Sequence, residues 1–454
     1  MSSINPEIFR AYDVRGIYPT EINEEVAHKI SQALVSFLNS QNLMVNNVIV
    51  VGRDCRLSSP SIFKSFSEGV IRAGVDVVDI GEVSTDTLYF ALNFYQADSA
   101  VMITASHNPP EYIGVKMVAR GQKFICGDWG ISEIKKLVLG GKIKEAGRLG
   151  NVIETEVLSA YLQHILGLID LKRIRPLKVV VDAGNGMGGK IIEELAERAP
   201  VKLFPLYFKP DGRFPNHLPN PLIPENIKDL QEEVAKRQAS FGLALDGDAD
   251  RTIFVDEKGE IISGDMIVAL FAQYFLKKEP EANIVYNLTC SKSVPEIIKE
   301  SGGRPIKTRT GHAFMKEAAK KHRAIFGGEI SGHLYFQDVF YAECGGLVFL
   351  LMLKILSETK EPLSKLIKKF KRYHRIGEVN FEVEDREGTI KKLAEVYKEG
   401  HKDWLDGLTV DFNDWWFNAR PSNTEPLLRI VIEAKEKKKV EEELKRITGI
   451  INKT

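Results

Sequence analysis

The sequence predicts an α/β protein built from several domains. Strand-like runs of β-branched residues alternate with amphipathic helical stretches almost to the end of the chain, which is typical of this class. The 454 residues are too many for one core, since domains commonly hold roughly 100–150 residues. Three segments repeat a β-branched run, a polar or glycine-rich loop and a helix, which suggests three related domains; they begin at residues 46–54, 177–186 and 282–291.

Polar, glycine-rich stretches give the expected domain boundaries. They predict four domains, at residues 1–150, 151–252, 253–368 and 369–454. The last part reads strand then helix twice and lacks the glycine loop of the others, so a small α+β domain is expected. Trp404, Trp415 and Trp416 are expected to pack inside it.

Composition excludes several classes of protein. Lys plus Arg and Asp plus Glu are both 62, so the net charge gives no reason to expect nucleic acid or an anionic membrane as partner. The four cysteines form no CxxC pair, which argues against a zinc ribbon and a disulfide scaffold. The start has no apolar signal core, and the run from Leu347 to Leu356 is too short to span a bilayer. We expect that run to be a buried helix and the protein to be soluble and cytoplasmic.

The segment TASHNPPEYIGVK, residues 104–116, follows an apolar run that predicts a buried strand. A serine that accepts a phosphoryl group needs exposure, a nearby proton acceptor and positive charge. Ser106 on an exposed loop, beside His107 and with Lys116 as base or cation, could meet these needs. The alternative is a capped turn followed by a solvated lysine.

The segment DGDADR follows the apolar run FGLAL. Asp246, Asp248 and Asp250 offer three carboxylates on a tight loop, which suits a hard cation such as Mg²⁺. Arg251 could hold a phosphate through two hydrogen bonds. A solvated acidic turn is the weaker interpretation, because three crowded carboxylates after a hydrophobic run need a compensating cation. No second cluster of His and Asp suited to a metal is evident.

Two later loops could bind a substrate. In GGEISGH, the alternating residues Glu329, Ser331 and His333 would point the same way in an extended loop, and a carboxylate with a hydroxyl suits sugar hydroxyls. In RPSNTEP, Arg420 stands among hydroxyl and amide side chains, which together could cradle a phosphate. A glycine-rich turn and a Ser/Asn turn with one solvated arginine are the respective alternatives.

A third loop, residues 184–189, matches the dinucleotide pattern G-x-G-x-x-G between a strand and a helix. Asp211 stands at about the right spacing for a ribose carboxylate. A single match of this kind also fits a glycine turn that lets a helix pack closely on a sheet. Dinucleotide binding is kept as an alternative.

Taken in order, these motifs resemble the α-D-phosphohexomutase superfamily, in particular its phosphomannomutase/phosphoglucomutase group. The resemblance covers nearly the whole chain, through FRAYDVRG (9–16), GRDCRLSS (52–59), TASHNP, PDGRFPNHLPNP (210–221), DGDADR, TRTGH (308–312), GGEISGH and RPSNTEP. It implies four domains around a central cleft, three related α/β domains with mixed sheets and a fourth like the TATA-binding protein.

The resemblance also implies a reaction. Ser106 carries a phosphate, gives it to a hexose monophosphate, and recovers the other phosphate from a hexose 1,6-bisphosphate intermediate. Mg²⁺ is bound by Asp246, Asp248 and Asp250 together with an oxygen on Ser106. Contacts in catalysis or to the serine loop are implied for Arg15, His107, Lys116, Arg251 and His312. Substrate contacts are implied for Arg309, Glu329, Ser331, His333, Arg420, Ser422, Asn423, Thr424 and Arg429.

Two positions depart from the family pattern. Ile113 stands where asparagine is usual in the serine loop, and Arg309 where lysine is common, which keeps the charge and changes its geometry. The substrate is expected to be a sugar phosphate, with glucose or mannose open and phosphoglucosamine mutase an alternative. A serine phosphohydrolase and a non-catalytic sugar-phosphate sensor are the competing classes, and the oligomeric state is open.

Overall fold

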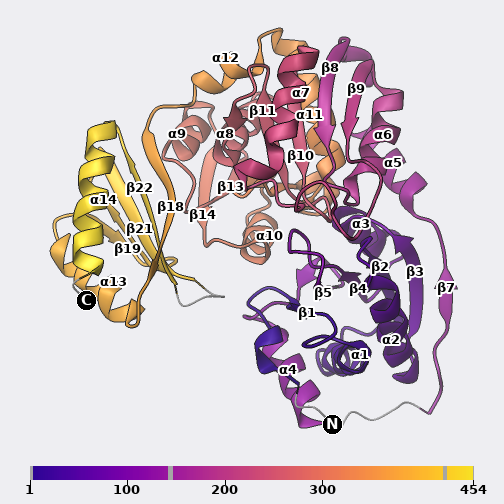
Figure 1. The fold of residues 1–454 in the computed structure, drawn as a ribbon. Coiled ribbons are helices and arrows are strands. Elements are labelled where there is room, and N and C mark those ends of the chain that lie inside the picture. The colour runs from indigo at the N-terminus through magenta and orange to yellow at the C-terminus, as the bar shows by residue number, and fades with distance from the viewer. Residues whose placement is uncertain (1–3, 142–146, 423–426, 453–454) are drawn as a thin grey trace. The chain divides into compact units, whose positions relative to one another are not determined.

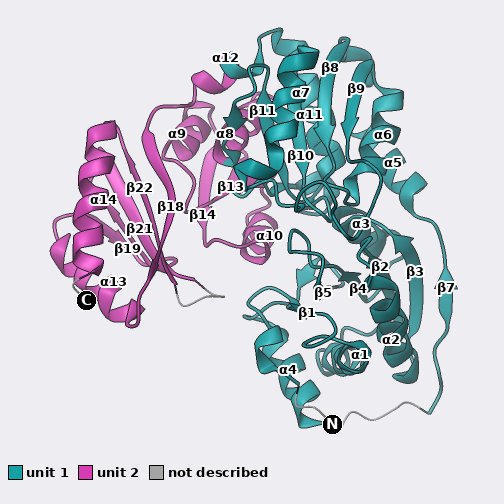
Figure 2. Ribbon diagram, in the orientation of Figure 1, with its two compact units in different colours: residues 1–264, 331–364 teal, residues 265–330, 365–454 magenta. Residues whose placement is uncertain are grey.

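A computed structural model describes residues 4–141, 147–422 and 427–452. The chain, drawn in Figure 1, divides into the two compact units that are coloured in Figure 2. Unit 1 contains Met1–Gly264 and Ser331–Ser364, and unit 2 contains Asp265–Ile330 and Lys365–Thr454.

The first sheet of unit 1 is mixed, with the order β1-β5-β4-β2-β3-β7 and β6 paired to β5. Its strands are β1 (Val14–Ile17), β2 (Val48–Arg53), β3 (Asp76–Glu82), β4 (Ser99–Ile103), β5 (Tyr112–Ala119), β6 (Lys123–Phe124) and β7 (Val152–Glu154). The helices of this region are α1 (Glu24–Ser40), α2 (Ser59–Arg72), α3 (Thr85–Phe94) and α4 (Ile131–Gly140). β2 pairs in parallel with β3 and β4, whereas β5 is antiparallel to β1 and β4.

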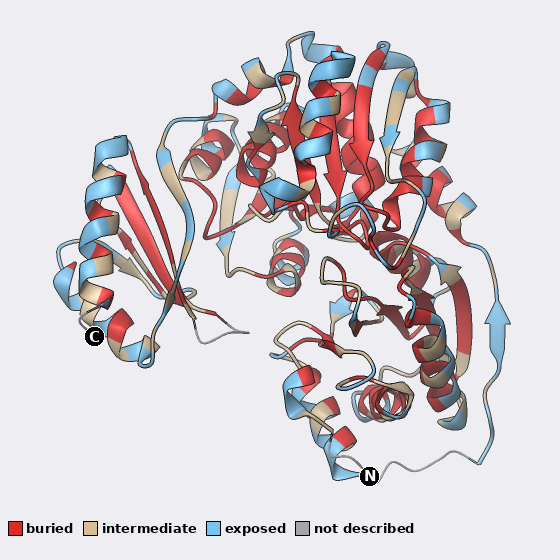
Figure 3. Cartoon of the chain, in the orientation of Figure 1, coloured by how far each residue is buried: buried red, intermediate tan, exposed pale blue. Residues whose placement is uncertain are grey.

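Helices cover both faces of this sheet. Ile49 and Val51 of β2 pack in the core that includes residues of α1, α2 and α4, whereas Val50 between them packs with Leu88 of α3. Burial on both faces explains why the strand is continuously hydrophobic in the sequence. In Figure 3 the strand β7, by contrast, is exposed along its whole length.

The second sheet of unit 1 has the order β12-β11-β10-β8-β9. Its strands are β8 (Leu177–Asp182), β9 (Val201–Leu206), β10 (Phe241–Leu245), β11 (Thr252–Asp256) and β12 (Ile261–Ile262), with helices α5 (Leu158–Gly167), α6 (Gly188–Arg198) and α7 (Lys228–Arg237). Unit 1 also holds the antiparallel pair β16 (Leu334–Phe336) and β17 (Ala342–Glu343), and α11 (Gly345–Thr359), which contacts α6. Residues 345–357 of α11 are buried, which confirms the predicted buried helix. Among the described residues, no helix is both long and apolar enough to cross a membrane.

Unit 2 contains a third set of strands and helices. They are α8 (Gly264–Leu276), β13 (Asn283–Asn287), α9 (Ser293–Glu300), β14 (Arg304–Thr308), α10 (His312–Lys321), β15 (Phe326–Gly328) and α12 (Leu363–Lys368). The first residue of α8 and the first two residues of α12 belong to unit 1. β13 pairs in parallel with β14 and β15. The three predicted strand–loop–helix repeats are therefore confirmed as β2–α2, β8–α6 and β13–α9.

The C-terminal part of unit 2 is an antiparallel sheet with the order β18-β22-β21-β20-β19. It consists of β18 (His374–Glu382), β19 (His401–Asp403), β20 (Leu408–Asp411), β21 (Trp415–Pro421) and β22 (Leu427–Ala434), with α13 (Arg386–Val396) and α14 (Lys437–Ile451). Both helices pack on the sheet in one core, as expected for a small α+β domain. Trp415 and Trp416 are buried, but the prediction for Trp404 is wrong: it is 55% exposed, because it lies in the β19–β20 connection and not on a strand facing the helices.

Candidate functional site

The serine loop joins β4 to β5 in unit 1. The backbone N–H of Ser106 donates to Thr104 Oγ1 (2.8 Å), and Ser106 has a φ of +50°, an uncommon conformation for a residue with a side chain. Strained backbone of this kind collects at functional sites. The expected exposure is wrong, since Ser106 is only 3% exposed. The reason is tertiary: its carbonyl lies against Gly247, where an added Cβ would stand 2.5 Å from the Ser106 oxygen.

Arg56 binds the backbone of the serine loop, a role that its sequence motif did not indicate. Its guanidinium donates to four carbonyls of the loop, those of Ser106 (2.9 Å), Asn108 (2.7 Å), Pro109 (2.6 Å) and Tyr112 (3.1 Å). Arg56 is 1% exposed, pairs with Asp54 (3.1 Å), and stacks over the Phe214 ring at 5.0 Å. The sequence signal was present in GRDCRLSS, but nothing local to that motif shows that its second arginine is buried.

Arg56→Lys should lower turnover by about a hundredfold, because the lysine ammonium cannot replace the planar arginine guanidinium that orients four carbonyls. The same change should cost about 2–4 kcal/mol in the free energy of unfolding, since a buried cation loses most of its hydrogen bonds. Steady-state kinetics and thermal denaturation measure the two effects. Arg53→Lys is the matched control, because Arg53 lies in the same motif and pairs with Asp79 away from the loop. Equal losses in both variants would show that Arg56 does not position the serine.

Buried carboxylates face the serine from the β10–β11 loop. Asp246, Asp248 and Asp250 are at most 5% exposed. Ser106 Oγ donates to Asp246 Oδ2 (2.8 Å), and Lys116 Nζ lies 2.6 Å from carboxylate oxygens of both Asp248 and Asp250. One ligand atom from each aspartate lies within 4.8 Å of the others, so the three could hold a metal ion.

Burial and the nearby charges shift the pKa values of Asp246 and Lys116. Burial, Asp250 and Asp248 raise the pKa of Asp246 well above its usual range. Burial also acts on Lys116 and lowers its pKa, but the three aspartates outweigh burial and raise it. The three neighbouring carboxylates therefore favour the charged form of Lys116.

Further cationic and histidine side chains surround the serine. Arg15 of β1 donates to Ala105 O (3.2 Å), Asn108 Oδ1 (2.5 Å) and Asp13 Oδ2 (2.5 Å). His107 Nδ1 lies 3.2 Å from Ser106 Oγ. Burial, Arg251 and Arg15 lower the pKa of His107 well below its usual range, so this imidazole is neutral.

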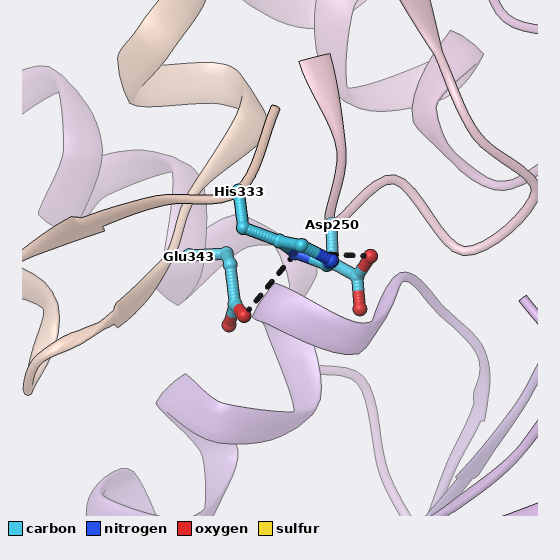
Figure 4. Close-up of side chains that lie close together, drawn as sticks. All are labelled: Asp250, His333 and Glu343. Carbon is cyan, nitrogen blue, oxygen red and sulfur yellow. Dashed lines mark ion pairs between the residues drawn. The ribbon is translucent and has the colours of Figure 1, made fainter. Parts of the chain in front are cut away.

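His333 joins Asp250 to Glu343 (Figure 4). Its Nδ1 lies 3.6 Å from Asp250 Oδ1 and 3.5 Å from Glu343 Oε1, while its Nε2 accepts from Arg251 Nε at 3.0 Å. Ligand atoms of Asp250, His333 and Glu343 lie within 4.8 Å of one another. The prediction that no second His/Asp cluster exists is therefore wrong, because the fold joins residues that are far apart in the sequence.

The residues of the TRTGH and GGEISGH motifs lie in separate local settings. In unit 2, Glu329 accepts from the backbone N–H of Gly311 (3.3 Å), which brings the loops after β15 and β14 together. Arg309 lies 3.8 Å over the Phe314 ring, and His312 Nδ1 is 3.5 Å from Lys316 Nζ. In unit 1, Ser331 Oγ is buried. Residues 330 and 331 form a turn, so the alternating side chains do not lie along one extended segment.

Arg420, on β21, and Arg429, on β22, stand opposite each other in the sheet. Both pair with Glu378 of β18, Arg429 at 3.1 Å. Ser422 follows directly after β21 and its carbonyl accepts from Arg386 (3.4 Å). Asn423 and Thr424 lie outside the described residues.

The glycine loop at residues 184–189 has no free phosphate cradle. The N–H groups of Gly184, Asn185, Gly186 and Met187 donate to Asp182, Tyr207, Ala183 and Gly247, respectively. An added Cβ on Gly186 would stand 2.5 Å from Gly247 O. These glycines let the loop pack against the DGDADR loop, so the dinucleotide interpretation is wrong.

Ile113, which stands where asparagine is usual in the family, is a fully buried core residue of β5.

Comparisons with known proteins match the whole order of motifs. Four models of the phosphoglucomutase/phosphomannomutase family match the chain: alpha/beta/alpha domains I, II and III at residues 6–137, 159–259 and 263–373, and the C-terminal domain at residues 378–450. A phosphomannomutase of Vibrio cholerae is 38% identical to this chain over 94% of each chain. A Xanthomonas campestris protein with the name "Phosphohexose mutases" is 36% identical over 94% of this chain and 95% of its own. The crystal structure of a phosphoglucomutase/phosphomannomutase family protein from Burkholderia thailandensis superposes with a TM-score of 0.89 at 34% identity, covering 98% of this chain and 97% of that one. The chain belongs to the phosphoglucomutase/phosphomannomutase family of phosphohexose mutases.

Proposed function

We propose that this protein interconverts hexose 1-phosphates and hexose 6-phosphates through a phosphate carried on Ser106. The observation that supports this most directly is the hydrogen bond of Ser106 Oγ to Asp246 (2.8 Å), inside a cluster where Lys116 forms ion pairs with two more carboxylates. A nucleophile, a set of oxygen ligands for a hard cation and several fixed cations together fit phosphoryl transfer.

The reaction proceeds in two matching halves. The phosphorus–oxygen bond to Ser106 breaks, a bond forms to the free hydroxyl oxygen of the sugar monophosphate, and in the sum of the step the proton of that hydroxyl passes to Ser106 Oγ. The hexose 1,6-bisphosphate then turns over, and Ser106 Oγ takes the other phosphate while its proton passes to the sugar oxygen that is released. The sum is an isomerisation without net loss of phosphate.

Asp246, Asp248 and Asp250 are the proposed ligands of Mg²⁺, which suits oxygen donors and spreads the charge of the transferred group when it is bound. Lys116, Arg15 and Arg251 supply fixed positive charge from the protein itself. Because Ser106 Oγ already contacts Asp246, a phosphate on that oxygen has the ligand set beside it.

The substrate-binding roles rest on the family resemblance. Glu329 and Ser331 are proposed to bind sugar hydroxyls, with Arg309 and His333 as further substrate contacts. His312 is proposed as a contact in catalysis or to the serine loop. The phosphate that is not transferred is assigned to Arg420, Ser422, Asn423, Thr424 and Arg429. The predicted domains each contain one of the four motif loops. The serine loop lies in residues 1–150, DGDADR in 151–252, GGEISGH in 253–368 and RPSNTEP in 369–454.

Purified protein should convert both glucose 1-phosphate and mannose 1-phosphate to their 6-phosphates. Glucose and mannose share every hydroxyl except the orientation at C2, so discrimination at an unbound position is about 1–3 kcal/mol, or roughly 10–200-fold in kcat/KM. Coupled assays on glucose, mannose and glucosamine phosphates measure this. A larger ratio would indicate a direct contact at C2.

The same assay separates the competing classes. A serine phosphohydrolase would release inorganic phosphate in step with substrate loss, and a non-catalytic sensor would bind without turnover. Preferred conversion of glucosamine 6-phosphate would favour the phosphoglucosamine alternative.

A further inference from the structure

We propose that Glu378 competes with substrate phosphate for Arg420 and Arg429 and so sets how quickly that phosphate is released. The inference rests on the proposed function, because it takes these two arginines as ligands of the phosphate that is not transferred. It adds a residue, Glu378, that no motif of the sequence singled out.

The backbone directs Glu378 toward the arginines. The ladder between β18 and β22 shifts register between Ile376 and Val379, so Gly377 and Glu378 form an irregularity in an otherwise regular pair of strands. Bulges of this kind re-aim a side chain and are frequent next to active sites. Here Glu378 Oε2 binds Arg420 Nη2 and Glu378 Oε1 binds Arg429 Nη1 (3.1 Å).

The arginine pair needs an anion. Arg420 and Arg429 are directly opposite across β21 and β22, and like charges in that position repel each other. Arg420 is 9% exposed, which strengthens its demand for a counter-charge. One carboxylate with an oxygen on each guanidinium satisfies both, in the same way that two oxygens of a phosphate would.

Glu378 is also positioned so that a phosphate can displace it from the two arginines. It lies at the surface, with its side chain 31% exposed, whereas its partner Arg420 has an 11% exposed side chain. A phosphate dianion carries more charge than a carboxylate, and Glu378 would repel it if both stayed on the arginines. Substrate must therefore break or weaken two ion pairs as it binds, and the same ion pairs re-form when it leaves. This exchange limits affinity and favours release, which a reaction that turns its bisphosphate requires in every cycle.

The test compares Glu378→Gln with the wild-type enzyme. We expect glucose 1-phosphate and inorganic phosphate each to bind about tenfold more tightly to the variant, because the competing charge is gone while the side-chain shape remains. KM should fall and kcat should fall with it, since release becomes slower. Isothermal titration calorimetry and steady-state kinetics measure both. Glu395→Gln is the control, since Glu395 is an exposed glutamate of α13 in the same domain and its loss removes the same charge.

Equal or weaker binding by Glu378→Gln would overturn the proposal and show that Glu378 only holds the arginines in place. Arg420→Ala separates this failure from failure of the proposed function. If Arg420→Ala weakens glucose 1-phosphate binding more than tenfold while Glu378→Gln leaves it unchanged, the phosphate site stands and the competition does not. If Arg420→Ala binds both ligands like the wild type, the arginines are not phosphate ligands, and both proposals fall.

Discussion

Ser106→Ala should reduce mutase turnover at least about a thousandfold, because the oxygen that carries the phosphate between the two half-reactions is removed. The fold should remain intact. The Ser106 side chain contributes one hydrogen bond to Asp246, whereas the loop is held by backbone contacts from Arg56 and Thr104. Alanine leaves those contacts in place, although it must still adopt the positive φ of residue 106.

Mass spectrometry and kinetics test the same assignment independently. Wild-type protein incubated with a hexose 1,6-bisphosphate should yield a phosphopeptide that contains residue 106, and Ser106→Ala should not. Ser159→Ala is the matched control, since Ser159 is an exposed serine of α5 in unit 1. Near-normal turnover by Ser106→Ala, or a phosphate on another residue, would contradict the phosphoserine mechanism.

Removing divalent metal should abolish turnover, and Mg²⁺ should restore it. Three buried carboxylates lie together here, and Lys116 offers one positive charge, which pairs with Asp248 and Asp250. A phosphate on Ser106 would add negative charge beside Asp246 that Lys116 alone cannot offset, so a bound cation becomes necessary for transfer. We expect chelator to reduce the rate at least about a thousandfold.

Asp248→Asn tests the ligand set directly. The amide keeps the shape but removes a charge that faces Lys116 (2.6 Å) and Thr85 (2.5 Å). Activity should fall about a hundredfold or more, and the Mg²⁺ concentration for half-maximal activity should rise. Asp170→Asn, an exposed change in unit 1, should do neither. Full activity in excess chelator would show that the acidic loop is structural.

Much of the fold could be predicted from local pattern. The β-branched runs before residues 54, 186 and 291 became β2, β8 and β13, each followed by a helix. The apolar run at 347–356 became the buried helix α11. These predictions succeed because the spacing of apolar residues along the chain shows which face of a strand or helix is buried. Trp404 failed because a large apolar residue in a connection carries no such periodicity.

The candidate residues were found from the sequence, but their partners were decided by the tertiary structure. Ser106, Asp246, Asp248 and Asp250 stand out by residue type and by the loops that follow apolar strands. Nothing in those loops shows that Ser106 is buried. Nor do they show that the counter-ion of Asp248 is Lys116, which stands 132 residues earlier in the chain.

By itself, the sequence determined the alternation of strands and helices, the four motif loops and their order, which is enough to identify the family. Only the tertiary structure decided that Arg56 holds the serine loop, that Glu343 faces His333, and that Glu378 lies between two arginines. The physical reason is that secondary structure depends on neighbours in the chain, whereas ion pairs and buried hydrogen bonds join residues that only the folded sheets bring together.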